Sequence, residues 1–176
     1  LICETDLSED QRTYAEAIRS SSQALLTIIN DVLDLSKLDA QKLVLHRVDF
    51  DLHALFRHTA IAFQAEAREK GIALELDIAD DVPDRASGDD VRLRQVLVNL
   101  IGNAVKFTLH GEVRVEVLGR GPDKPRGVVV RVRDTGVGIP PAKLAKIFER
   151  FSQGESATTR RFGGTGLGLT ISRTLV

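Results

Sequence analysis

Apolar residues recur at heptad spacing between about residues 8 and 38 of the chain. The repeating set is Tyr14, Ile18, Leu25, Ile28, Val32 and Leu35, with Ser21 in register. No Gly or Pro interrupts residues 8–38, and Ser8 stands where a helix N-cap belongs. Such a helix is about 45 Å long at 1.5 Å per residue. The pattern predicts one long helix.

Further apolar residues widen this stripe beyond the seam of a two-stranded coiled coil; they are Leu26, Ile29 and Leu33. A wide stripe is typical of a helix in a four-helix bundle, which would need a partner helix that this chain does not contain. A long helix that lies on its own domain remains the alternative. We expect residues 1–45 to form part of a helical hairpin and residues 46–176 to form a separate domain.

From residue 46 onward the pattern alternates between helix and strand. Asp51 can cap a helix that ends at Lys70 and Gly71. Its apolar face would hold Leu52, Leu55, Phe56, Ala60, Phe63 and Ala67. Residues 72–78, "IALELDI", alternate strictly between apolar and polar positions, as a strand with one buried face does.

A second helix should begin after "SGDD" at residues 87–90. Its apolar face would hold Leu93, Leu97, Leu100 and Ala104. Residues 112–118 and 127–133 then predict two strands that pair as a hairpin across a polar loop. This order predicts an α/β fold with a mixed sheet and helices packed on one face of it.

Composition narrows the class of protein. Of the 176 residues, 43% are hydrophobic and 28% charged, as in ordinary soluble domains. With 24 basic and 25 acidic residues the net charge is −1, which predicts no nucleic-acid partner. The single cysteine cannot form an internal disulfide, so we expect a reducing, cytoplasmic compartment. The absence of Met predicts a fragment of a longer protein, which leaves room for a membrane anchor elsewhere.

A polar row follows the apolar face of the second helix. Its members, at spacings of three and four, are Arg92, Gln95, Asn99, Asn103 and Lys106. A row of this kind is ordinarily the solvated side of a helix. Asparagine is a mediocre helix former, however, and its neutral oxygen can ligate Mg²⁺ beside a phosphate. Lys106 could contact the same phosphate as a point charge.

Two glycine-rich stretches carry further candidate chemistry. "FGGTGLGLT" at residues 162–170 precedes a helix start, where backbone N–H groups favour anions, although a flexible turn would explain it equally well. "DTGVGIP" at residues 134–140 follows a strand, and Asp134 is either a turn residue or an acceptor for the amine of adenine. Between them, residues 152–161 predict a mobile lid that carries Arg160.

Four ordered motifs resemble those of sensor histidine kinases. "NLIGNAVKF" resembles the N box, "DTGVGI" the G1 box, "IFERF" the F box and "GGTGLGL" the G2 box. Residues 24–43, "ALLTIINDVLDLSKLDAQKL", look like the second helix of the family's dimerisation and phosphoacceptor domain. The lid sequence is most similar to that of hybrid kinases, which carry a receiver domain further on. The implied fold is the ATP-binding α/β sandwich shared with type II topoisomerases and Hsp90-type chaperones.

The resemblance implies a role for individual residues. Asn103 would ligate Mg²⁺ with support from Asn99, and Lys106 would contact the phosphates of ATP. Asp134 would bind the adenine amine, and Arg160 would lie on the side of the γ-phosphate. The other implied nucleotide-binding residues are Gly136, Gly138, Ile139, Phe148, Phe151, Gly164, Thr165, Gly166, Leu167 and Gly168.

The implied function is that of the ATP-binding catalytic module of a two-component sensor kinase. It would transfer the γ-phosphoryl of ATP to a histidine outside this fragment, in the same protein or its dimer partner, for relay to a response regulator. None of the chain's histidines matches the acceptor; they are His46, His53, His58 and His110. We therefore expect no activity from the fragment alone. We also expect the family's last strands to be missing. The alternatives are an ATP-gated clamp of the chaperone type and a scaffold without nucleotide.

Overall fold

The computed structural model describes residues 5–40, 42–120, 127–150 and 165–176. The chain divides into two compact units, Leu1–Leu43 and Val44–Val176.

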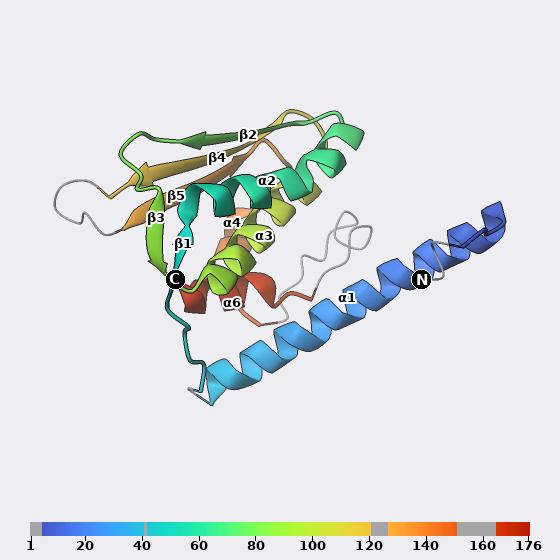
Figure 1. Cartoon of the computed structure of the whole chain (residues 1–176), viewed down its shortest axis with the longest axis horizontal. Helices are drawn as coiled ribbons and strands as arrows, with labels where there is room; N and C mark the ends of the chain where they lie inside the picture. The colour runs from blue at the N-terminus through green and yellow to red at the C-terminus, as the bar shows by residue number, and fades with distance from the viewer. Residues whose placement is uncertain (1–4, 41, 121–126, 151–164) are drawn as a thin grey trace. The chain divides into compact units, whose positions relative to one another are not determined.

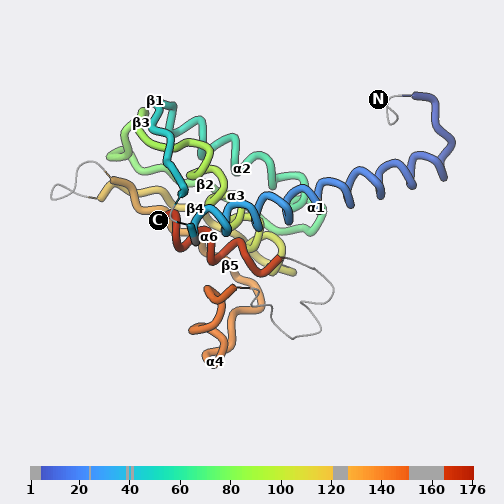
Figure 2. Tube along the Cα trace, turned by 90° about the horizontal axis from the view of Figure 1, so that it is seen from below, coloured from blue at the N-terminus to red at the C-terminus, as the bar shows by residue number. Residues whose placement is uncertain are grey.

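The first unit contains the helix α1, Glu9–Asp39. Ser8 caps it through a reciprocal pair of bonds, because the backbone N–H of Gln11 donates to Ser8 Oγ at 3.3 Å and that of Ser8 donates to Gln11 Oε1 at 3.0 Å. The predicted start of the long helix is confirmed. The apolar stripe is exposed, with 68% of both Tyr14 and Ile18 accessible to solvent. Figure 2 shows α1 as one continuous helical segment.

A mixed sheet forms the centre of the second unit. Its strands are β2 (Ala73–Ile78), β4 (Glu112–Gly119) and β5 (Val128–Asp134), in the order β2-β4-β5. β2 and β4 run parallel, whereas β4 and β5 run antiparallel as a hairpin in which Val115 lies opposite Val132. Both the predicted hairpin and the mixed sheet are confirmed (Figure 1).

Helices α2 (Leu52–Glu69) and α3 (Asp90–Phe107) lie against the sheet and bury one of its faces (Figure 1). Val113, Val115 and Val117 of β4 point toward this core and are fully buried, while Arg114 and Glu116 alternate with them on the other face. The helix side of the core consists mainly of Leu52, Leu55, Phe56, Leu97, Ile101 and Val105.

The buried face of α3 differs from the one that the sequence predicts. Leu97 and Ala104 are buried as expected, but Leu93 and Leu100 are only partly buried. The other buried positions are Val96, Ile101 and Val105. α3 contacts α2, the strands β4 and β5, and the short helix α6 (Gly168–Leu175). Because these neighbours lie on more than one side of α3, more of its surface is buried than in a helix that packs on a sheet alone, and the centre of the buried face is shifted.

Two short strands that the sequence did not predict precede the two core helices. β1 (Val48–Asp51) pairs antiparallel with β3 (Arg85–Gly88). "RASG" has little β propensity, and four residues show no clear period. Because the pairing is antiparallel, α2 begins at the end of the pair where Asp51 lies opposite Arg85, and α3 begins at the other end, where Gly88 lies opposite Val48. A further short helix, α4 (Pro141–Leu144), follows the loop after β5.

Asp89 caps α3 and also holds the segment that leads into β1. Its two carboxylate oxygens accept the backbone N–H groups of Arg92 and His46, each at 2.9 Å. Burial acts to raise the pKa of this carboxyl, but the two hydrogen bonds and the charges of Arg92 and His46 outweigh it, so the pKa is lowered. The stabilisation is therefore complete above the unfolded-state pKa of about 3.9 and is lost as the pH falls toward the folded-state pKa.

Asp89→Ala should lower the free energy of unfolding by about 1 kcal/mol at pH 7, as for other lost N-caps. Because protonation removes the charged part of the interaction, the difference from wild type should shrink at pH 3. Urea unfolding at the two pH values measures both effects. Asp90→Ala, which removes a neighbouring carboxylate but keeps the cap, should cost less. A deficit of Asp89→Ala that is the same at both pH values would contradict this role of the charge.

Candidate nucleotide-binding site

The polar row of α3 is held by hydrogen bonds between its own members. Asn103 Nδ2 donates to Asn99 Oδ1 at 3.1 Å, and Arg92 Nη1 donates to Gln95 Oε1 at 2.7 Å. Asn99, Asn103 and Lys106 are each partly buried, so this part of the row is not simply a solvated face. The structure therefore brings the three predicted residues of the row together on one side of α3.

The bond between the two asparagines orients Asn103. Because the oxygen and nitrogen of an amide lie on opposite sides of its carbon, Asn103 Oδ1 is directed away from Asn99. Mg²⁺ accepts a neutral oxygen of this kind when phosphates and waters complete its shell. Among the described residues, no group of three or more His, Cys, Asp and Glu could hold a metal alone. Asn103 thus fits a metal that arrives with a phosphate, rather than a metal held entirely by the protein.

The environment of Lys106 disfavours the charged form of its ammonium group. Its partial burial lowers the pKa of the ammonium group, and the nearby charge of Lys70 lowers it further. Lys106 Nζ lies 5.0 Å from the centre of the Phe107 ring. Lys70 in turn donates to the carbonyl oxygens of Val105 and Lys106, at 3.0 and 3.3 Å, at the end of α3. A phosphate beside Lys106 would offset this penalty on its charge.

The loop after β5 is attached to the end of α3. Asp134 Oδ1 accepts the backbone N–H of Gly136 at 2.9 Å, so this carboxylate oxygen closes the turn. A Cβ at Gly136 would lie 2.6 Å from the carbonyl oxygen of Phe107. Gly138 adopts a φ of 66°, which explains the second glycine.

Thr135 fixes this loop and was not singled out from the sequence. Its backbone N–H donates to Glu112 O at 3.1 Å, its hydroxyl donates to His110 O at 3.2 Å, and the same hydroxyl accepts the N–H of Glu112 at 3.0 Å. These bonds join the loop to the first residue of β4 and to the segment just before it. Threonine within a "DTG" turn was the only signal in the sequence, and it does not reveal a partner that lies 23 residues away.

Glycine is required at positions 166 and 168, at the start of α6, for two different reasons. Gly166 adopts a φ of 69°, and the hydroxyl of Thr165 accepts the N–H of Leu167 at 3.1 Å in the same turn. Gly168 has no room for a side chain because a Cβ there would overlap Asn99 Oδ1. Close packing of α6 on α3 therefore requires glycine at 168, whether or not a phosphate binds nearby. Leu167 and Ile171 complete this packing, with 1% and 2% of their surface exposed.

Phe148 is joined to α6. Its carbonyl oxygen accepts the hydroxyl of Thr170 at 2.9 Å, and the guanidinium of Arg173 lies 5.3 Å from the centre of its ring. Ile139, on the loop after β5, is 47% exposed. The predicted residues Phe151, Arg160 and Gly164 lie outside the described residues.

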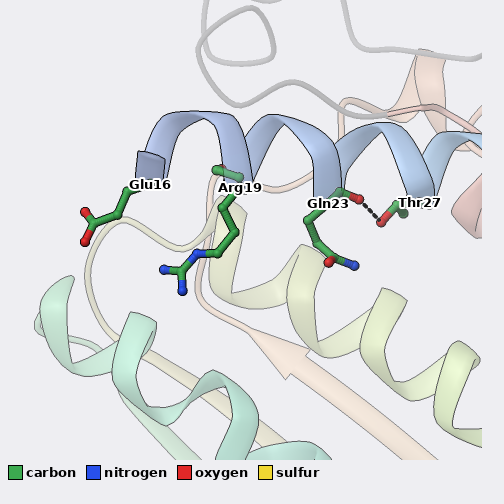
Figure 3. A pocket seen from close by; sticks show the side chains of 5 residues that line it. Glu16, Arg19, Gln23 and Thr27 are labelled. Carbon is green, nitrogen blue, oxygen red and sulfur yellow. Dashed lines mark hydrogen bonds between the residues drawn. The ribbon is translucent and has the colours of Figure 1, made fainter. Parts of the chain in front are cut away.

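A shallow hollow on α1 is lined by Glu16, Arg19, Ser20, Gln23 and Thr27 (Figure 3). The hydroxyl of Thr27 donates to the backbone oxygen of Gln23 at 3.0 Å, a bond within one helical turn. All the lining residues belong to the same helix, and none of the predicted site residues is among them.

The chain matches two protein families. Residues 88–176 match the histidine kinase-, DNA gyrase B- and HSP90-like ATPases, and residues 1–41 match the His Kinase A phospho-acceptor domain. The chain therefore belongs to the family of histidine kinase-, DNA gyrase B- and HSP90-like ATPases. This finding confirms the family that the four sequence motifs indicate.

Curated relatives that resemble the whole chain are hybrid and sensor kinases. It is 41% identical to the signal transduction histidine-protein kinase BarA of Escherichia coli over 177 aligned positions, which cover all of this chain and 19% of BarA. It is 44% identical to the sensor histidine kinase AruS of Pseudomonas aeruginosa, of which it covers 18%. The chain thus spans about a fifth of the length of these relatives.

Solved structures share the fold. The structure of full-length ShkA in complex with AMPPNP is 36% identical with a TM-score of 0.78, and the match covers 99% of this chain and 35% of that one. The structure of ThkA in complex with the response regulator TrrA is 28% identical with a TM-score of 0.66, over 98% of this chain and 46% of that one. The predicted fold class is confirmed. In the part of the chain that the structure describes, no helix has the length and apolar character needed to cross a membrane.

Proposed function

We propose that this chain binds ATP with Mg²⁺ and presents the γ-phosphoryl group for transfer to a histidine elsewhere in the full-length protein or its dimer partner. The observation that carries the proposal is the row Asn99, Asn103 and Lys106 on α3. Asn99 lies against the start of α6, and the carbonyl of Phe107, next to Lys106, accepts the N–H of Val137 in the loop after β5 at 3.3 Å. This arrangement would supply an oxygen ligand, a cation and a helix start to one nucleotide.

Each part of the site fits one part of the nucleotide. Asn103 Oδ1 would ligate Mg²⁺, and Lys106 would contact phosphate oxygens. The backbone N–H groups at the start of α6 would add to the binding of the triphosphate. The second carboxylate oxygen of Asp134 would accept the amine of adenine, and Gly136 and Gly138 leave the loop without side chains that would block a flat ring.

The proposed chemistry depends on positioning. Phosphoryl transfer needs in-line placement of the donor and acceptor and stabilisation of charge on the transferred group, and little covalent participation by the protein. Lys106 suits this task because partial burial and the charge of Lys70 lower the pKa of its ammonium group, and a phosphate beside it would counter both effects. Arg160 would add a second cation on the side of the γ-phosphate.

The acceptor histidine would come from a segment other than residues 1–45, which contain no histidine. His53 has a structural environment, since its Nε2 lies 3.1 Å from Val82 O and its Nδ1 lies 3.6 Å from a carboxylate oxygen of Asp84. The exposed apolar stripe of α1 supports a bundle with a helix that carries the acceptor, and hence a homodimer. The match of residues 1–41 to a phospho-acceptor domain favours a kinase over an ATP-gated clamp.

The further partners follow from the same proposal. The phosphoryl group would pass to an aspartate on the receiver domain of a response regulator, in a two-component phosphorelay. The ThkA–TrrA complex, in which a similar chain is bound to a response regulator, supports this order. We place the module in the cytoplasm, where ATP is available, and propose no nucleic-acid partner because the net charge is −1.

Incubation with γ-labelled ATP and Mg²⁺ tests the proposal. The chain should bind Mg-ATP in equilibrium dialysis but acquire no stable acid-labile label. Addition of the full-length protein's phosphoacceptor helices, as a separate polypeptide, should produce such label on that polypeptide. A folded sample that binds no adenine nucleotide, or that labels itself, would overturn the proposal.

A further inference from the structure

A chain of polar contacts runs from α6 to the proposed metal ligand. Asn99 Nδ2 donates to the hydroxyl oxygen of Ser172 at 2.8 Å, and Asn99 Oδ1 accepts Asn103 Nδ2 at 3.1 Å. Ser172 is 7% exposed, so its hydroxyl lies within the packed contact between α6 and α3. The three side chains form one series, Ser172–Asn99–Asn103.

This series has a direction. Because the Asn99 amide donates through Nδ2 and accepts through Oδ1, its orientation determines which atom of the Asn103 amide pairs with it. If Asn99 were turned over, its nitrogen would face Asn103, which could then pair only through its own oxygen. That arrangement would consume Asn103 Oδ1, the atom proposed to ligate Mg²⁺.

The surroundings of Asn99 favour the observed direction. Its Oδ1 lies against Gly168, the first residue of α6, closely enough that a Cβ there would overlap it. The first turn of a helix has unpaired N–H groups and a positive field, which favours an oxygen over an NH₂ group. With the oxygen on that side, Asn99 Nδ2 needs an acceptor, and the hydroxyl oxygen of Ser172 supplies it.

We propose that Ser172 is a positioning residue for metal binding: it holds the Asn99 amide in the orientation that keeps Asn103 Oδ1 directed toward Mg²⁺. Ser172 itself touches neither metal nor nucleotide. The inference rests on the proposed function, because it assigns a purpose to α6 in the same Mg-ATP site.

The test compares nucleotide binding with and without the metal. Ser172→Ala should weaken the affinity for Mg-ATP about three- to tenfold, the effect of one lost neutral hydrogen bond, and leave the affinity for ATP in EDTA unchanged. Ser172→Thr keeps the hydroxyl and should restore most of the Mg²⁺-dependent gain. Thr174→Ala is the matched control, because it removes an exposed hydroxyl of α6 that, within the described residues, bonds Thr170 O of the same helix at 3.0 Å.

A double-mutant cycle separates positioning from a general effect on packing. In an Asn99→Ala background there is no amide to orient, so Ser172→Ala should cause no further loss of Mg-ATP affinity. Equal losses with Mg²⁺ and with EDTA, additive losses in the cycle, or an unchanged Mg-ATP affinity in Ser172→Ala would each overturn the inference. If the wild-type chain itself failed to bind Mg-ATP, that result would refute the proposed function and not the role of Ser172 alone.

Discussion

Asn103→Asp should weaken the binding of Mg-ATP by about 1 to 3 kcal/mol, the range for a mispaired polar or charged contact. The substitution keeps the shape of the side chain but places a negative charge beside the triphosphate. It also replaces the donor Nδ2, now 3.1 Å from Asn99 Oδ1, with an oxygen that repels it. Isothermal titration calorimetry with Mg-ATP and with adenosine measures the two effects separately.

Adenosine has no phosphates, so its binding should change little in Asn103→Asp. Gln95→Glu is the matched control, because it makes the same change from amide to carboxylate on the same row of α3. Gln95 Oε1 already accepts from Arg92 Nη1 at 2.7 Å, so a carboxylate is tolerated there. Equal losses for Mg-ATP and adenosine would show that Asn103 has only a structural role.

Gly136→Ala should cause a second large effect, on stability and on nucleotide binding together. The new Cβ would lie 2.6 Å from the carbonyl oxygen of Phe107 and 2.8 Å from Asp134 Oδ1. Phe107 ends α3 and its backbone cannot move without the helix, so the loop must shift and take Asp134 with it. We expect a loss of about 1 to 3 kcal/mol in the free energy of unfolding, as for other overpacked sites.

Urea unfolding and calorimetry with adenosine measure this prediction, since displacement of Asp134 should weaken adenine binding at least tenfold, or about 1.4 kcal/mol. Gly88→Ala is the control, because its Cβ would meet nothing closer than an atom of Phe50 at 3.9 Å. Gly138→Ala measures the effect of backbone strain without overlap, because Gly138 has a φ of 66° and no atom lies within 4 Å of the new Cβ. Full adenosine affinity in Gly136→Ala would refute the attachment of Asp134 through this loop.

Features set by neighbours along the chain were predictable. The caps Ser8 and Asp51 each bond a residue three positions on, and the strict alternation of residues 72–78 depends only on the period of a strand. The row of Asn99, Asn103 and Lys106 follows from helical spacing alone. The roles of the predicted site residues stay predictions.

Features that depend on distant partners were not predictable. The β1–β3 pair joins segments with no strand signal of their own, and the buried face of α3 is set by four elements that surround it. Thr135 and Lys70 act on segments 23 to 36 residues away. No local pattern carries such information.

The sequence by itself determined the long first helix, the α/β order, the mixed sheet and the family, because periodicity, capping and motif spacing are properties of neighbouring residues. Only the tertiary structure decided why residue 168 must be glycine and how the amides of Asn99 and Asn103 are oriented. Both depend on the contact between Asn99 and α6, where Asn99 bonds Ser172, a residue 73 positions further along the chain. The physical reason is that van der Waals overlap and hydrogen bonding act through space, and folding alone brings those atoms together.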